Sequence, residues 1–142
     1  MFTGEYRHSV DGKGRIAVPA KFRGQLDGGA FVTRWIDACL AIFPRAEFEA
    51  LADKVGSVGI ADSSARTFGR ALFASAYEVD LDRQGRIVVP AALRDLAGLD
   101  NEAVVVGARD HAEIWAPARW DEYRIAMEAP DAMAEHLSGL GI

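Results

Sequence analysis

Hydrophobic and polar residues alternate over several short stretches of the chain, and this pattern predicts β-strands. The clearest stretch is 77–81, where Tyr77, Val79 and Leu81 alternate with acidic residues. Asp37 and Asp110 fall where the chain should turn between neighbouring strands. The remaining strands are predicted over 6–10, 16–18, 31–33, 39–43, 87–89, 103–107 and 113–115.

Apolar residues at helical spacing, together with prolines and glycines near the ends, predict the helices. Pro19 and Pro90 precede short helices over 20–26 and 91–96, because proline fits the first turn of a helix. The sequence therefore predicts a β-rich α+β fold with flanking helices. The longer helices are predicted near 48–55, 63–73, 120–127 and 131–137, with a linker over 56–62.

The strongest feature of the sequence is an internal repeat. Residues 11–23 match residues 82–94 at a constant spacing of 71 positions, so the chain is a tandem duplication of a unit of about 70 residues. The identical positions include Asp11/Asp82, Gly14/Gly85, Arg15/Arg86, Pro19/Pro90 and Arg23/Arg94. The expected parts are a first repeat over 1–60, a linker and helix over 61–71, a second repeat over 72–128 and a C-terminal tail helix over 129–142.

The same short loop occurs in both copies, from Asp11 to Gly14 and from Asp82 to Gly85. Aspartate in such a loop accepts hydrogen bonds from backbone N–H groups, and glycine adopts a backbone conformation that a residue with a Cβ atom resists. Each aspartate could also hold the arginine four positions later. We therefore expect these four residues to organise the loops, and we prefer this role to a catalytic pair of carboxylates.

The arginines that follow the loop glycines are the strongest candidates for binding a ligand. Arg15 and Arg86 occupy equivalent positions, and each loop adds a second cation, Lys13 or Arg83. An outward arginine on a strand is often only solvated or paired with a carboxylate, but here it is retained in both copies. A guanidinium group binds a phosphate or a guanine edge through two N–H groups. These four residues are therefore the expected DNA contacts.

The charge of the chain is unevenly distributed. The formal net charge of −5, taken alone, argues against a nucleic-acid ligand. However, residues 1–25 hold five lysines and arginines against two acidic residues, residues 82–94 hold three against one, and residues 121–142 hold one against five. A local basic face can bind phosphates on an acidic protein, because electrostatic fields decay over about 8–10 Å at ordinary salt.

Enzyme chemistry finds little support in the sequence. His8, His111 and His136 show no metal-ligand spacing, and no metalloprotease, nucleophile-elbow or phosphate-binding motif is present. We therefore expect no catalytic residue, no metal, no cofactor and no small-molecule substrate. Cys39 is the only cysteine, and it lies beside apolar residues, which predicts a buried hydrophobic side chain.

Three further patterns narrow the class of partner. Arg23 and Arg94 are repeated in the short helices and are expected to be structural, facing the helix dipole or a carboxylate. No apolar run approaches the roughly 20 residues that span a bilayer, and the start of the chain lacks a signal-peptide pattern, which predicts a cytoplasmic protein without a membrane partner.

Repeated aromatic residues have the spacing of a core rather than of a single-strand stacking surface, which favours duplex DNA. These pairs are Tyr6 with Tyr77, Phe43 with Trp115, and Phe48 with Trp120.

The chain resembles the MraZ family over essentially its whole length. The resemblance is carried by residues 1–6, by the segment 11–16 with Pro19, and by the segment 82–87 with Pro90. One D-x-x-x-R motif alone would mean little. Two such motifs, in this order within a duplicated unit of this size, are much more specific.

The resemblance implies an AbrB-like swapped-hairpin barrel built from both copies in one chain, and assembly into a ring-shaped homo-oligomer. It also implies binding to repeated sites in the promoter of the division and cell-wall gene cluster, in the cytoplasm at the nucleoid. The D-x-x-x-R motif is the family's DNA contact, which corresponds here to Asp11 with Arg15 and to Asp82 with Arg86. The second loop departs from the first between aspartate and glycine, so unequal DNA contacts are possible.

Two alternatives remain open from the residues alone. A protein-interaction module of AbrB-like or antitoxin-like fold would make Arg15 and Arg86 dispensable and would dock its partner on exposed apolar surface. A small-molecule enzyme would need a polar pocket with convergent titratable groups. For the apolar residues of the tail, packing on the chain's own core or on a neighbouring subunit is the better expectation; these are Met127, Met133, Leu137 and Leu140.

Overall fold

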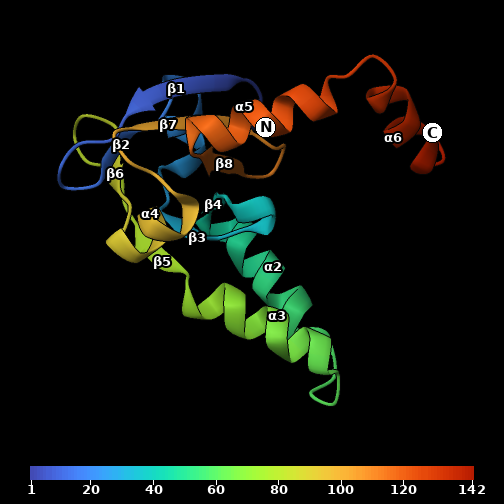
Figure 1. Ribbon diagram of the computed structural model, residues 1–142. Helices are drawn as coiled ribbons and strands as arrows, with labels where there is room; N and C mark the ends of the chain where they lie inside the picture. The colour runs from blue at the N-terminus through green and yellow to red at the C-terminus, as the bar shows by residue number, and fades with distance from the viewer.

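The computed structural model describes residues 1–142 and contains a six-stranded antiparallel sheet and a separate pair of short antiparallel strands. The strands are β1 (Glu5–Ser9), β2 (Arg15–Ala17), β3 (Ala30–Arg34), β4 (Leu40–Pro44), β5 (Tyr77–Val79), β6 (Arg86–Val88), β7 (Glu102–Gly107) and β8 (Ala112–Trp115). The large sheet has the order β1-β7-β8-β4-β3-β5, and β2 pairs with β6 (Figure 1). The strands lie close to the positions predicted from the sequence pattern.

The two copies of the repeat exchange strands. Strand β1 of the first copy pairs with β7 of the second, and β5 of the second copy pairs with β3 of the first. At the centre of the sheet β4 pairs with β8, so the order of equivalent strands is the same from either edge. The two copies therefore share one sheet, and neither could bury its apolar strand faces alone.

The helices flank this sheet and confirm a β-rich α+β fold. Helix α1 (Ala20–Arg23) continues as the 3₁₀ turn η1 (Gly24–Leu26), and a second turn, η2 (Ile36–Ala38), connects β3 to β4. The other helices are α2 (Arg45–Ser57), α3 (Ser63–Ala74), α4 (Ala91–Ala97), α5 (Pro117–Met127) and α6 (Ala132–Gly139). Helices α2 and α3 form a hairpin that projects from the sheet, whereas α5 lies along β7 (Figure 1).

The main core joins the large sheet to the β2–β6 pair. One cluster of 19 buried apolar residues includes Ile16 and Ile87 from the short strands and Val32 and Ile42 from the large sheet. The prediction of a buried cysteine is confirmed, because Cys39 is fully buried and its burial raises the pKa of the thiol. Apolar packing on one face therefore holds the short strands against the large sheet, and their other face reaches solvent.

The prediction that all repeated aromatic residues lie in the core is wrong for one of them. Tyr77 is 44% exposed, because β5 is an edge strand and only Val79 of its three residues is buried. Tyr6 is half-buried and packs edge-on against Phe22, with ring centroids 5.4 Å apart. The other four aromatic residues are buried as predicted; these are Phe43, Phe48, Trp115 and Trp120.

The tail was expected to pack on the chain's own core or on a neighbouring subunit, and within one chain α6 does not pack on the core. Helix α6 has no buried residue, and Leu140 just beyond it is 73% exposed. The helix stands beyond the end of α5, away from the sheet (Figure 1). Of the four apolar residues considered, only Met127 at the end of α5 packs against a buried cluster. No helix of the structure is both long enough and apolar enough to cross a membrane.

Candidate nucleic-acid interface

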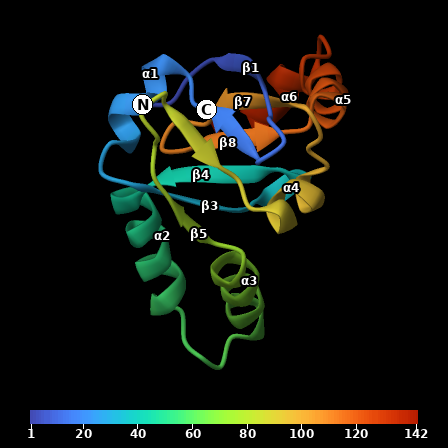
Figure 2. The ribbon, with the colours of Figure 1, turned by 90° about the vertical axis from the view of Figure 1, so that its left-hand side faces the viewer.

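The two arginine-bearing loops lie together at the end of the molecule opposite α6 (Figure 1). Each loop leads directly into one strand of the short β2–β6 pair. Figure 2 looks onto this end and shows β2, in blue, and β6, in yellow-green, in front of the larger sheet. We call this pair of strands the ribbon.

In the first loop the aspartate binds both the backbone and the arginine. Oδ1 of Asp11 accepts hydrogen bonds from the backbone N–H groups of Lys13 and Arg15, each at 2.9 Å, and Oδ2 accepts one from Nε of Arg15 at 2.6 Å. The N–H of Arg15, acting first, with its guanidinium and the N–H of Lys13, lowers the pKa of Asp11 to about 2. The carboxylate therefore stays ionised, and it fixes Arg15 through the backbone N–H and Nε.

The second loop repeats this arrangement. Oδ1 of Asp82 accepts hydrogen bonds from the backbone N–H groups of Gln84 at 2.8 Å and Arg86 at 2.9 Å, and Oδ2 accepts one from Nε of Arg86 at 2.9 Å. These bonds, led by the one from the N–H of Arg86, lower the pKa of Asp82. The loop glycine has φ +73° here and +79° at Gly14, a conformation that favours glycine.

The ribbon brings the two loops together. In its register Ile16 lies opposite Ile87, and both of these side chains point into the core. The guanidinium of Arg86 lies 4.0 Å from the carboxylate of Asp11, which also pairs with Arg15 at 2.6 Å. One aspartate therefore contacts both arginines, and the two D-x-x-x-R motifs form a single charged site.

The four predicted contact residues all reach solvent at this site. The side chains of Arg15 and Arg86 are 32% and 29% exposed on the outer face of the ribbon. Lys13 and Arg83 lie in the loops, are exposed, and form no ion pair. Arg15 contacts a carboxylate only through Nε, and Arg86 through Nε and a 4.0 Å contact of NH1, so most N–H donors of both guanidinium groups remain available for a ligand.

Each loop is supported by the other copy of the repeat. The carbonyl of Gly85 accepts a hydrogen bond from the N–H of Val18, and the carbonyl of Gly14 accepts one from the N–H of Val89, both at 2.9 Å. The side chain of Arg23 lies against Gly85, where a Cβ atom would collide with it. The loop of the second copy therefore rests on residues of the first.

Arg23 and Arg94 are structural, as expected, and both lie in the last turn of their helices, but they contact the loops rather than a carboxylate. Nε of Arg23 donates to the carbonyl of Val18 at 3.0 Å, and Arg94 lies against Gly14, so that a Cβ atom on that glycine would stand 2.8 Å from its Cζ. Neither arginine forms an ion pair. The two arginines lie at equal distances from the loop glycines of their own copies, and this repetition was the signal in the sequence that marked them. Spacing along the chain could not show that each arginine contacts the loop glycine of the other copy.

A second cluster of titratable groups lies around His111, in the turn directly before β8. The imidazole stacks on Phe43 at 4.7 Å and meets Trp35 edge-on. Nδ1 lies 2.7 Å from Oδ1 of Asp110, and Nε2 lies 3.7 Å from Oε2 of Glu113. Burial lowers the pKa of His111, but the two carboxylates outweigh it, so that the pKa is raised overall.

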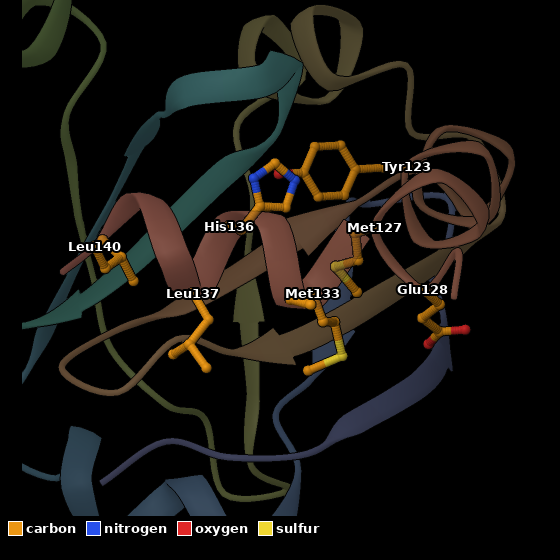
Figure 3. A pocket seen from close by; sticks show the side chains of 8 residues that line it. Tyr123, Met127, Glu128, Met133, His136, Leu137 and Leu140 are labelled. Atoms are coloured by element: carbon orange, nitrogen blue, oxygen red, sulfur yellow. The ribbon is translucent and has the colours of Figure 1, made fainter. Parts of the chain in front are cut away.

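An apolar groove lies between α5 and α6. It has a volume of about 690 Å³ and is lined by Tyr123, Met127, Met133, Leu137 and Leu140 among others (Figure 3). No group of three or more histidine, cysteine or acidic side chains could hold a metal ion. Most of the residues that line the groove are hydrophobic, so it offers mainly apolar contact.

The fold and the loops first define a class: a tandemly duplicated α+β protein in which two arginine-bearing loops of the same design meet on one β-ribbon. The family described as "MraZ protein, putative antitoxin-like" matches residues 1–71 and 72–136. The chain belongs to the MraZ family, which confirms the resemblance seen in its two motifs.

Curated relatives match over nearly the whole chain. The "Transcriptional regulator MraZ" of Roseiflexus sp. (strain RS-1) is 47% identical over 91% of this chain and 90% of its own length. The protein of the same name from Thermomicrobium roseum is 45% identical over 99% of both chains. The one from Desulfitobacterium hafniense (strain Y51) is 45% identical over the full length of both.

Proposed function

We propose that the protein is a transcriptional regulator that binds duplex DNA sequence-specifically through the two loops of the ribbon. Its sites are repeated elements in the promoter of its own division and cell-wall gene cluster. The observation that carries this proposal is the meeting of Arg15 and Arg86 on one exposed face, with Lys13 and Arg83 beside them. The name of the relatives, transcriptional regulator, supports the same class.

The dimensions of the ribbon fit the major groove. Two paired strands lie about 4.8 Å apart, and the major groove of B-DNA is about 12 Å wide and admits a two-stranded ribbon. In this arrangement the arginines contact guanine O6 and N7, whereas Lys13 and Arg83 at the two loop ends contact phosphates. The pairing of each arginine with its aspartate through Nε leaves the outer edge of the guanidinium free for a base.

We propose further that the shared core is a swapped-hairpin barrel and that the active form is a ring-shaped homo-oligomer. The exchange of strands between copies supports the barrel. One ribbon neutralises few phosphates and should bind weakly, whereas several linked ribbons gain effective concentration on repeated sites. The exposed apolar side chains of α6 support self-association, with a second copy of the chain as their partner.

The test is a binding measurement on the full chain by fluorescence anisotropy, across a series of salt concentrations. One duplex comes from the region upstream of the protein's own operon, and the other has a random sequence. Arg15→Ala with Arg86→Ala should remove the preference for the first duplex, about 5- to 150-fold per arginine. The control, Arg34→Ala with Arg70→Ala, changes exposed arginines of β3 and α3 that form no ion pair, and should keep it.

The salt series separates the two kinds of contact. Lys13→Ala with Arg83→Ala should weaken binding to both duplexes equally and reduce the slope of log affinity against log salt by about 2. The proposal fails if the wild type prefers neither duplex at any salt concentration. It also fails if the folded Arg15→Ala, Arg86→Ala protein keeps the preference, and a protein-interaction module is then the better interpretation.

A further inference from the structure

The outer face of the ribbon differs between the two copies at a single position. Ile16 and Ile87 point inward from the middle of each strand and are buried. Val88 is 52% exposed, and its equivalent in the first copy is an alanine. The outward residues of the ribbon are Arg15, Ala17, Arg86 and Val88.

The register places Val88 directly beside an arginine of the other copy. The hydrogen bond from the N–H of Val89 to the carbonyl of Gly14 marks these two residues as a hydrogen-bonded pair. The next pair, Arg15 with Val88, is then a non-hydrogen-bonded pair, in which Cα atoms are about 4.5 Å apart and side chains are closest. An exposed isopropyl group therefore lies next to the guanidinium proposed to contact a base.

The major groove presents one apolar group to such a side chain, the C5 methyl of thymine. We propose that Val88 is a specificity-determining residue that contacts this methyl group, on the base pair next to the one contacted by Arg15. This inference rests on the proposed function of the ribbon. An apolar side chain at the centre of a charged site is unfavourably exposed in the free protein, and contact with a methyl group removes that surface from water.

The consequence is an unequal recognition of the two halves of a DNA site. The half contacted by Arg15 and Val88 prefers guanine with an adjacent thymine. The half contacted by Arg86 and Ala17 requires the guanine only, because the alanine side chain is too short to reach the neighbouring base. The pseudo-symmetric protein therefore binds a site whose two halves differ at one base pair.

The test begins with selection of duplexes from a random pool by the full-length protein. Each thymine of the selected site is then replaced singly by deoxyuridine, which removes only the methyl group. For the wild-type protein, replacing one thymine in the stretch of DNA bound by each ribbon should lower the affinity about fourfold, which is the effect of one buried methyl group. With Val88→Ala the same replacement should have no effect, and Ala17→Val should create a second sensitive thymine in the opposite half.

The outcomes separate the two proposals. If the selection enriches no sequence, or if Arg15→Ala with Arg86→Ala still binds the selected duplex, the proposed function itself fails. If selection succeeds but deoxyuridine is tolerated at every thymine, or Val88→Ala keeps the wild-type sensitivity, the role of Val88 is refuted and the function stands. Val88 and Ala17 are on the outer face, so both variants should melt as the wild type does, which a thermal scan checks.

Discussion

Replacing Gly14 by alanine should destabilise the whole fold, although the residue lies in a loop. Gly14 has φ +79°, and an alanine held there costs about 1–2 kcal/mol. Its Cβ atom would stand 2.8 Å from the carbonyl oxygen of Val89 and 2.8 Å from Cζ of Arg94. Val89 follows β6 directly and donates its N–H to the carbonyl of Gly14, so its own carbonyl cannot move without disturbing this pairing, and the close contact adds about 1–2 kcal/mol.

The same loop contains a matched control. Gly12 is exposed and does not have a positive φ, and no atom lies within 4 Å of the position that an added Cβ atom would occupy. Gly12→Ala should therefore change the free energy of unfolding by no more than about 0.5 kcal/mol. The two variants add the same methyl group two residues apart, so any difference between them reports the conformation and surroundings of Gly14.

The measurements are urea unfolding and thermal melting at one fixed protein concentration, because self-association would otherwise shift both. Gly14→Ala should lower the free energy of unfolding by about 2–4 kcal/mol, and Tm by about 5–15 °C for a chain of this size. If Gly14→Ala and Gly12→Ala unfold alike, the loop is not held by its backbone conformation and by the other copy, and the reasoning is refuted.

Three further predictions concern charged and titratable groups. The pKa of Asp11 is lowered to about 2, so the stability that its ionised form contributes is present above about pH 4 and is lost as the pH falls towards 2. Asp11→Asn should therefore flatten the loss of unfolding free energy over that window in acid urea titrations; equal slopes would contradict this. Arg23→Met should shift the amide NMR signal of Gly85, in the other copy, more than signals in the loop of its own copy, and should cost about 1 kcal/mol. The pKa of His111 is raised, so its stabilising charge is fully present below its ordinary value of 6.5 and is lost as the pH rises through the higher folded value. The Tm of the wild type should thus fall relative to that of His111→Gln as the pH rises above about 6.5, and an imidazole titration by NMR at or below 6.5 would contradict this.

The parts of the site that depend on local interactions could be predicted from the sequence. The aspartate of each loop binds N–H groups two and four residues later, and the glycine adopts a positive φ within the same turn. Such contacts are short in sequence, so spacing alone indicates them. The alternation in β2 and β6 likewise predicted which side chains turn inward, as Ile16 and Ile87 do.

The partners of the strands could not be predicted in this way. A period of two residues states which face of a strand is buried but not which strand lies beside it. Strand β1 pairs with β7, almost a hundred residues away, and the exposed position of Tyr77 follows from the edge position of β5. The apolar residues of α6 were predicted to pack on the core or on a neighbouring subunit, because composition alone does not distinguish these two cases, and within one chain they do not pack on the core.

The exchange of contacts between the two copies explains which positions of the motif carry the same residue in both. Gly14 rests on Arg94 and Gly85 on Arg23, so each copy holds the loop of the other, and one motif alone would lack its support. The residues that shape the loops are therefore the same in both copies, whereas the residues between aspartate and glycine, and the outward position of Val88, differ. Two loops of equal shape and unequal surface are suited to a ligand with approximate twofold symmetry and a difference between its halves, and a duplex DNA site is such a ligand.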